Sequence, residues 1–237
     1  MSTSNLRKVI RIARQNSVIT PRLTGWLAQH GEGVVVNDPE TAELLLRLVS
    51  MGKSRAYAFH PSQLYQCERR QVFDYHDVEG LREYNAQLQN IFNDGTWRHT
   101  RWQIMLMNAG ILDRVEVAVA MPTLRLEGSM DGVNDTDSWM FELKGTSQSK
   151  RVRDYGVMPA HVQQIHAYLL AADLPKCVVV YEDKSTQDWI ELEVHRDEGT
   201  ITEIKEILGR LNEAIDHDQL PEVQHECKTG SGTAFND

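Results

Sequence analysis

The sequence has few cysteines, no Cys-x-x-Cys pair and no long apolar run. Its three cysteines, Cys67, Cys177 and Cys227, are scattered along 237 residues. This scatter argues against a zinc ribbon and a disulfide framework, and it fits a reducing compartment. No segment is apolar enough to span a membrane, and the N-terminus lacks the apolar core of a signal peptide. We therefore expect a cytoplasmic protein without membrane partners.

Positive charge is also scarce, because 34 acidic residues face 25 basic ones and give a net charge of −9. This balance argues against a general nucleic-acid coat protein. It does not exclude an enzyme that binds DNA through a local basic strip, since a cluster of acids is needed to hold a metal. The hydrophobic content of 41% allows a sizeable core in one large domain, with or without a small appendage.

Residues 124–144 have the pattern of a β-hairpin, with two apolar strands around a turn rich in Asn, Asp and Ser. Asp131 lies near the end of the first strand. If the turn is centred near Thr136, Asp131 lies across from Phe141, to within one residue. Glu142 and Lys144 are two residues apart on the second strand and so share a face. The hairpin therefore brings two carboxylates and one amine within a few ångströms, a set that can chelate a divalent cation and orient or deprotonate a water.

The acid-x-Lys pattern is weak by itself, because this chain contains it at Glu142/Lys144, Glu182/Lys184, Glu203/Lys205 and Glu226/Lys228. Only the first pair lies on an apolar strand that follows a Gly-x-x-Asp strand. These residues alone are equally consistent with an edge hairpin that has a solvated polar face.

The N-terminal part indicates helices. Apolar residues between Leu6 and Ala13 fall at helical spacing, a short element follows at 21–30, and Asp38 can cap a further helix. These helices either form an add-on that contacts DNA or a protein partner, or pack on the main core.

Further along, Ser62 can cap a helix that carries Arg69 and Arg70, which either meet phosphate or are solvated. Residues 81–110 predict a pair of helices with Gly95 near the centre. His99 follows, and a single histidine is more often structural than a metal ligand.

The remaining elements are strands at 115–119, 177–181 and 189–194, a helix beginning at Pro159 and a helix at 198–216. Between the hairpin and Pro159, residues 145–158 predict a flexible polar loop. Its basic residues are Lys150, Arg151 and Arg153. This loop either faces phosphate or is an ordinary surface loop.

Five pieces of the sequence occur together in one order. They are a Ser-x-Leu-x-x-Cys-x-Arg-Arg helix start (Ser62 to Arg70), Gly95 with His99, Gly128-Ser-Met-Asp131, Glu142-Leu143-Lys144, and Gln164-x-x-x-Tyr168. In this order they resemble the PD-(D/E)xK nuclease superfamily, and within it the RecB-type exonucleases, which are related to CRISPR-associated adaptation nucleases and to phage exonucleases of the lambda type. The resemblance covers roughly residues 57–195.

The resemblance implies an α/β (α+β) fold with a restriction-endonuclease-like core, in which helices flank a central mixed sheet. The core would span residues 56–220, after an N-terminal helical extension at 1–55 and before a flexible tail at 221–237.

The resemblance also implies a role for each residue. Asp131, Glu142 and the backbone carbonyl of Leu143 would bind Mg²⁺ or Mn²⁺, and His99 would hold or support the metal. Lys144 would activate the attacking water. Gln164 and Tyr168 would position DNA or the lysine, and Glu116 and Glu127 are accessory candidates.

One feature of the family is missing. Several RecB-type relatives bind an iron–sulfur cluster through one upstream cysteine and three near the C-terminus. This chain has Cys67 upstream but only Cys227 near the end. Three thiolates cannot supply four ligands, so we expect no iron–sulfur cluster within one chain.

The expected function is that of a metal-dependent deoxyribonuclease, most consistent with an exonuclease in DNA recombination, repair or phage DNA processing. Its partners would be single-stranded DNA or duplex ends in the cytoplasm of a bacterial or phage-infected cell. Two alternatives stay open, namely a catalytically silent module that binds nucleic acid or protein, and a site-specific endonuclease.

Overall fold

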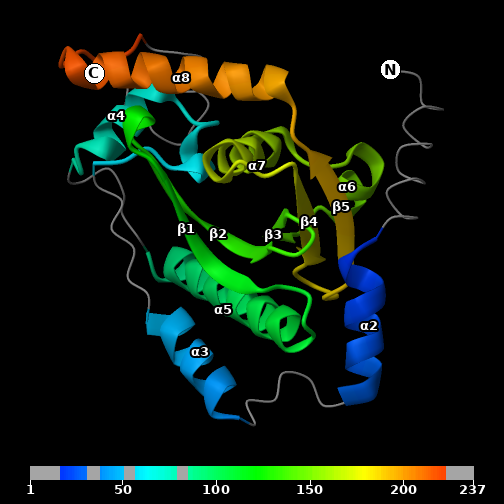
Figure 1. Ribbon diagram of the computed structural model, residues 1–237. Helices are drawn as coiled ribbons and strands as arrows, with labels where there is room; N and C mark the ends of the chain where they lie inside the picture. Colours follow the sequence, from blue (N-terminus) through cyan, green and yellow to red (C-terminus); the bar gives the residue numbers. More distant parts are fainter. Residues whose placement is uncertain (1–16, 31–37, 51–56, 79–84, 223–237) are drawn as a thin grey trace.

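The computed structural model describes residues 17–30, 38–50, 57–78 and 85–222 (Figure 1). The apolar stripe expected between Leu6 and Ala13, most of the C-terminal tail and Cys227 lie outside these residues.

A five-stranded mixed sheet forms the centre of the molecule, in the order β1-β2-β3-β4-β5. The strands are β1 (Arg114–Met121), β2 (Leu126–Asn134), β3 (Trp139–Thr146), β4 (Lys176–Asp183) and β5 (Trp189–His195). β3 and β4 are parallel, and the other neighbouring pairs are antiparallel.

Helices cover both faces of the sheet, which confirms the predicted α/β class (Figure 1). One face carries α5 (Ala86–Asn108), with α3 (Pro39–Ser50) packed on it and α2 (Ile19–His30) beside β5. The other face carries α7 (Pro159–Ala172) and α6 (Ser149–Tyr155). Beyond α7 lie α8 (Glu198–Asp216) and α4 (Glu68–Tyr75). Short 3₁₀ turns, η1 and η2, occur at Pro61–Gln63 and Pro122–Leu124.

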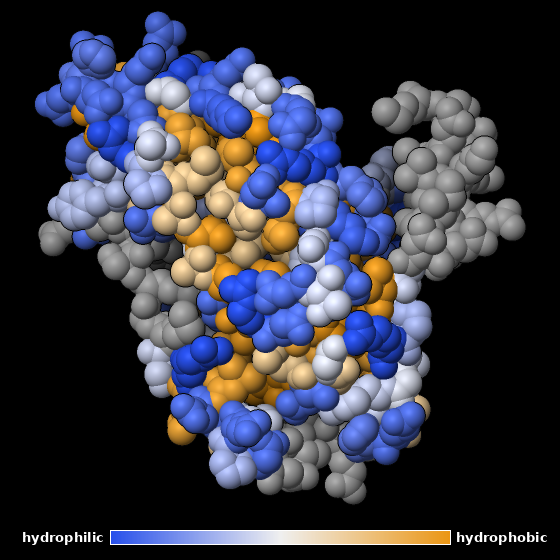
Figure 2. Space-filling model, viewed as in Figure 1, coloured by the Kyte–Doolittle hydropathy of each residue, from blue (hydrophilic) through white to orange (hydrophobic). Residues whose placement is uncertain are grey.

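The last helix shows how local signals set an element. The Asp197 carboxylate accepts the Thr200 N–H at 2.7 Å and so caps the first turn of α8. Ile201, Ile204 and Leu208 then bury one face of the helix, as their spacing predicts. Figure 2 shows a mostly hydrophilic surface over α8, with apolar residues gathered below it over the middle of the molecule. In the described part of the chain no helix combines the length and the apolar character that crossing a membrane requires.

The core between α5 and the sheet includes residues from the N-terminal helices. Ile19 and Leu23 of α2 and Leu48 of α3 are buried in the same cluster as Trp102 and Phe141. The described helices of this region therefore pack on the main core, which is one of the two arrangements that the sequence leaves open.

Two of the predicted elements were wrong in kind. Residues 86–108 form one helix instead of a pair, because a glycine costs only about 1 kcal/mol within a helix and burial of the second half outweighs this cost. Gly95 itself faces open space. The loop predicted at 145–158 contains the helix α6, which the buried Val152 anchors and which ends at Gly156, where φ is +80°.

The helix expected to begin after Ser62 begins later. Pro61–Gln63 form the 3₁₀ turn η1, and Cys67 occupies the N-cap position of α4 without capping it through its side chain. Phe59, which bridges to Leu126 in parallel orientation, ties the chain to β2 just before η1.

Candidate active site

The site begins where the β2–β3 ladder ends. The ladder pairs Asn134 with Trp139 and stops at Gly132 and Phe141. Asp131 and Glu142 are therefore the first residues beyond the ladder, on opposite strands. The turn lies where it was predicted, and Asp131 is offset from Phe141 by the one residue that the prediction allowed.

Strands β1 and β2 are both irregular beside Asp131. Met130 and Val133 pack in one cluster although they are three residues apart, so the alternation of β2 breaks at Asp131. Across from it on β1, Glu116 has a φ of +51°. Gln103 of α5 compensates for the break, because its Nε2 donates to the Asp131 carbonyl at 2.9 Å and to Glu116 Oε1 at 3.0 Å.

The Asp131 carboxylate is held from two sides. Its Oδ1 lies 3.0 Å from His99 Nδ1, and its Oδ2 accepts the Leu143 N–H at 2.7 Å. Burial raises the pKa of Asp131, but the His99 charge and these hydrogen bonds outweigh burial and hold the pKa below its usual value. Burial alone would lower the pKa of His99. The negative charge of the Asp131 carboxylate outweighs burial, so the pKa of His99 is raised.

Glu142, Lys144 and Gln164 form one hydrogen-bonded unit across β3 and α7. Lys144 Nζ lies 2.7 Å from Glu142 Oε1 and donates to Gln164 Oε1 at 2.8 Å, while Gln164 Nε2 donates to the same Glu142 oxygen at 2.9 Å. Burial raises the pKa of Glu142 to about 7, against the effect of Lys144. Burial lowers the pKa of Lys144, but the Glu142 contact outweighs it and raises this pKa, so the amine stays charged.

Tyr168 lies one turn beyond Gln164 and explains the glycine of the Gly128-Ser-Met-Asp131 segment. A Cβ at Gly128 would come within 2.9 Å of Tyr168 Cε1 and 3.1 Å of Pro61 Cδ. Only a glycine lets the tyrosine ring pack this closely over β2.

The basic residues expected to contact DNA fall into two groups. Arg69 and Arg70 lie on α4, where Arg69 donates to the Pro221 carbonyl at 3.4 Å and Arg70 lies 3.7 Å from Asp74. The second group, Lys150, Arg151 and Arg153, lies exposed on α6, which follows strand β3 directly.

The structure brings together Asp131, Glu142, Leu143 and Lys144 with His99, Gln164 and Tyr168, although they come from four elements. Gln103 and His161 also lie beside these residues, although no sequence motif includes them. Helical spacing could have indicated both. Gln103 lies four residues after His99, and His161 lies three residues before Gln164, so each shares a helix face with a predicted site residue.

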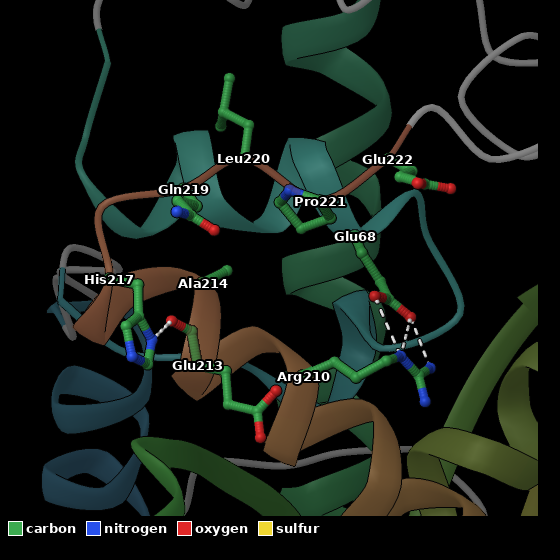
Figure 3. A pocket seen from close by; sticks show the side chains of 9 residues that line it. All are labelled: Glu68, Arg210, Glu213, Ala214, His217, Gln219, Leu220, Pro221 and Glu222. Carbon is green, nitrogen blue, oxygen red and sulfur yellow. Dashed lines mark hydrogen bonds and ion pairs between the residues drawn. The ribbon is translucent and has the colours of Figure 1, made fainter.

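A pocket of about 620 Å³ lies away from these residues, between α4 and the end of α8 (Figure 3). Arg210 fills one wall through hydrogen bonds to both Glu68 oxygens, the shortest at 2.6 Å. His217 Nδ1 donates to the Glu213 carbonyl of its own helix at 2.9 Å. The pocket holds none of the predicted site residues, and we assign it no role in the chemistry.

No protein-family model matches the sequence, and no curated protein matches it significantly. Solved structures do match. LHK-Exo in complex with dAMP aligns with a TM-score of 0.53 at 14% identity, over 69% of this chain and 90% of that chain. LHK-Exo itself, described as an alkaline exonuclease from Laribacter hongkongensis, aligns with a TM-score of 0.51 at 15% identity, over 75% and 93%. This chain thus shares the restriction-endonuclease-like fold of an alkaline exonuclease, as expected.

Proposed function

We propose that this chain is a metal-dependent DNA nuclease that hydrolyses phosphodiester bonds as an exonuclease. The observation that carries the proposal is the convergence of Asp131, Glu142 and Lys144 at the open end of the β2–β3 ladder, where Gln164 bridges the acid and the amine. Buried acids next to an amine are costly to keep, and a site without chemistry would not need them.

The donor set fits a hard divalent cation such as Mg²⁺ or Mn²⁺. Within the described residues no group of three or more His, Cys, Asp and Glu side chains converges as a metal cage. Mg²⁺ does not need such a cage, since it binds through one or two carboxylates and keeps several waters. Asp131 and Glu142 supply the carboxylates. The Leu143 N–H points toward Asp131. Since the N–H and the C=O of one strand residue point to the same side of the strand, the Leu143 carbonyl oxygen is a further candidate metal ligand.

A bound divalent cation would stabilise charge on the phosphate and lower the pKa of water. Lys144 stays protonated in the arrangement observed, so its role is to orient water and to stabilise charge on the scissile phosphate. Gln164 holds Lys144 and Glu142 in register. His99 fixes the Asp131 carboxylate and supports the metal site.

The substrate is DNA, with Tyr168 and the cations of α6 contacting the strand and Arg69 and Arg70 as a more distant basic group. LHK-Exo, whose fold this chain shares, binds dAMP. A deoxynucleotide of that class is the expected product here. We place the reaction in DNA recombination, repair or phage DNA processing.

Digestion of end-labelled DNA tests the proposal. Linear and circular DNA, single- and double-stranded, would be incubated with Mg²⁺, Mn²⁺ or a chelator. We expect metal-dependent loss of linear DNA and survival of circles. Loss of circles as well would replace the exonuclease with an endonuclease.

Two lysine variants provide the controls. Lys144→Ala should abolish cleavage. Lys176→Ala should not, because Lys176 lies at the start of β4, five residues before Tyr181, and forms its 2.8 Å ion pair with Glu193 of β5. Binding of DNA by folded protein without cleavage under either metal would instead identify a catalytically silent binding module.

A further inference from the structure

His161 lies beside the predicted site without belonging to any motif. It is on α7, one turn before Gln164, on the helix face that carries the contact to Lys144. Its neighbour Tyr181 is paired with Lys144 in the parallel β3–β4 ladder, so the two side chains share a face of the sheet. The two ring centroids of His161 and Tyr181 are 5.6 Å apart.

Hydrogen-bond accounting assigns the tautomer of this histidine. Tyr181 is fully buried, and its hydroxyl oxygen lies 3.2 Å from the Met158 N and 2.6 Å from His161 Nδ1. The Met158 N–H can only donate, so the oxygen accepts from it. Among the described residues, Nδ1 is then the one acceptor for the hydroxyl hydrogen. The opposite tautomer would leave a buried hydroxyl hydrogen unpaired, which is costly. The ring hydrogen of His161 therefore lies on Nε2.

The ring is also neutral. Burial and the nearby positive charge of Lys144 lower the pKa of His161 to about 4. Its Nε2–H makes no hydrogen bond in the part of the chain that the structure describes. Lys144 cannot accept a hydrogen bond, because an ammonium group only donates. Of the three N–H donors of the Lys144 ammonium group, Glu142 and Gln164 take two. The remaining Lys144 N–H and the His161 Nε2–H are together complementary to an anionic oxygen.

We propose that His161 is a substrate-binding residue whose Nε2–H donates to a non-bridging phosphate oxygen of the DNA strand beside Lys144. Tyr181 and the Met158 N–H act as positioning groups, since they fix the tautomer and the orientation of the ring. This inference rests on the proposed function, because it takes a DNA strand as the ligand of the same site.

DNA binding without turnover tests the inference. A short fluorescein-labelled single strand would be titrated in chelator, and Kd would be measured by anisotropy over a range of salt concentrations. His161→Ala should weaken binding about tenfold to a hundredfold, the loss of one hydrogen bond from a neutral donor to a charged acceptor. Since His161 is neutral, the slope of log Kd against log salt should stay unchanged, whereas loss of a cation that contacts phosphate, as in Lys144→Ala, should reduce it by about one unit.

Two further variants separate binding from folding. His161→Gln keeps an N–H donor of similar reach and should recover part of the affinity. His195→Ala removes an exposed histidine at the end of β5 and should leave affinity unchanged. Melting curves of all variants would confirm that they fold.

Nitrogen-15 NMR of the histidines tests the tautomer independently of DNA. The expected signal is that of an Nε2–H imidazole in the native protein and of a tautomer mixture in Tyr181→Phe. An Nδ1–H tautomer, or unchanged Kd in His161→Ala, would overturn the inference. DNA binding without cleavage would overturn only the proposed nuclease activity. Cleavage by the native protein together with an unchanged Kd in His161→Ala would overturn only the role of His161. Absence of DNA binding would overturn both.

Discussion

Glu182 holds α5 onto the sheet, and neutralising it should destabilise the whole domain. This fully buried carboxylate accepts hydrogen bonds from Arg98 at 2.7 Å, from Arg101 at 2.5 Å and from the Trp102 indole N–H. The three donors occupy one face of α5. Glu182→Gln keeps the shape of the side chain but leaves two guanidinium groups without their shared negative charge.

The loss of stability in Glu182→Gln depends on which other partners Arg98 and Arg101 retain. Removing one partner of a buried ion pair costs about 3–5 kcal/mol. Arg98 retains Asp94 at 2.9 Å, and the Arg101 side chain is 36% exposed and can turn into water. The expected loss for Glu182→Gln is therefore about 2–4 kcal/mol in the free energy of unfolding, below the upper limit for a fully buried pair.

An exposed ion pair of similar chemistry is the matched control. Arg114 contacts Asp135 at 2.7 and 2.5 Å, and both side chains are about half exposed. Because water competes for such a pair, Asp135→Asn should cost less than about 1 kcal/mol.

Urea unfolding followed by far-ultraviolet circular dichroism measures both variants. Circular dichroism is preferable to tryptophan fluorescence, since Trp102 itself contacts Glu182. The midpoint should fall for Glu182→Gln at an unchanged slope, because the surface exposed on unfolding stays the same. If Glu182→Gln cost no more than Asp135→Asn, the assignment of Glu182 as the anchor of α5 would be wrong.

Two more substitutions test the packing and the charge state of the site. Gly128→Ala should push the Tyr168 ring off β2 and cost about 1–3 kcal/mol, measured by thermal unfolding. Gly209→Ala, at a position with open space around it, should instead stabilise α8 by about 0.5–1 kcal/mol, and equal effects of the two substitutions would contradict the close contact at Gly128. Burial and the charge of Lys144 lower the pKa of His161 in the folded protein to about 4, below the ordinary 6.5. The unfolded chain therefore binds more protons between these two values, and stability falls as the pH falls through this window. The stability difference between the native protein and His161→Gln, measured by urea titration in chelator, should therefore rise from pH about 4 to about 6.5 and then level off; a flat difference would show that the imidazole is not desolvated.

Much of the fold could be predicted where the signal is local. The cap at Asp197 and the apolar spacing of Ile201, Ile204 and Leu208 mark α8 at its observed bounds. α7 likewise begins at the predicted Pro159. These elements follow from short-range hydrogen bonding and from the periodicity of the buried face.

Other elements depended on packing that no short window contains. Gly95 suggests a break, yet α5 continues through it because the following turns are buried against the sheet. The polar stretch around Arg151 suggests a loop. Val152, however, is buried where α6 packs on β4 and β5, and this burial stabilises a helix there.

The sequence alone determined the hairpin that carries Asp131, Glu142 and Lys144, because a short turn fixes which residues of two adjacent strands face each other. Only the tertiary structure decided that His99 meets Asp131 and that Tyr181 meets His161. These contacts join α5, α7 and β4 from opposite faces of the sheet, and their geometry is set by how buried surfaces pack and not by spacing along the chain.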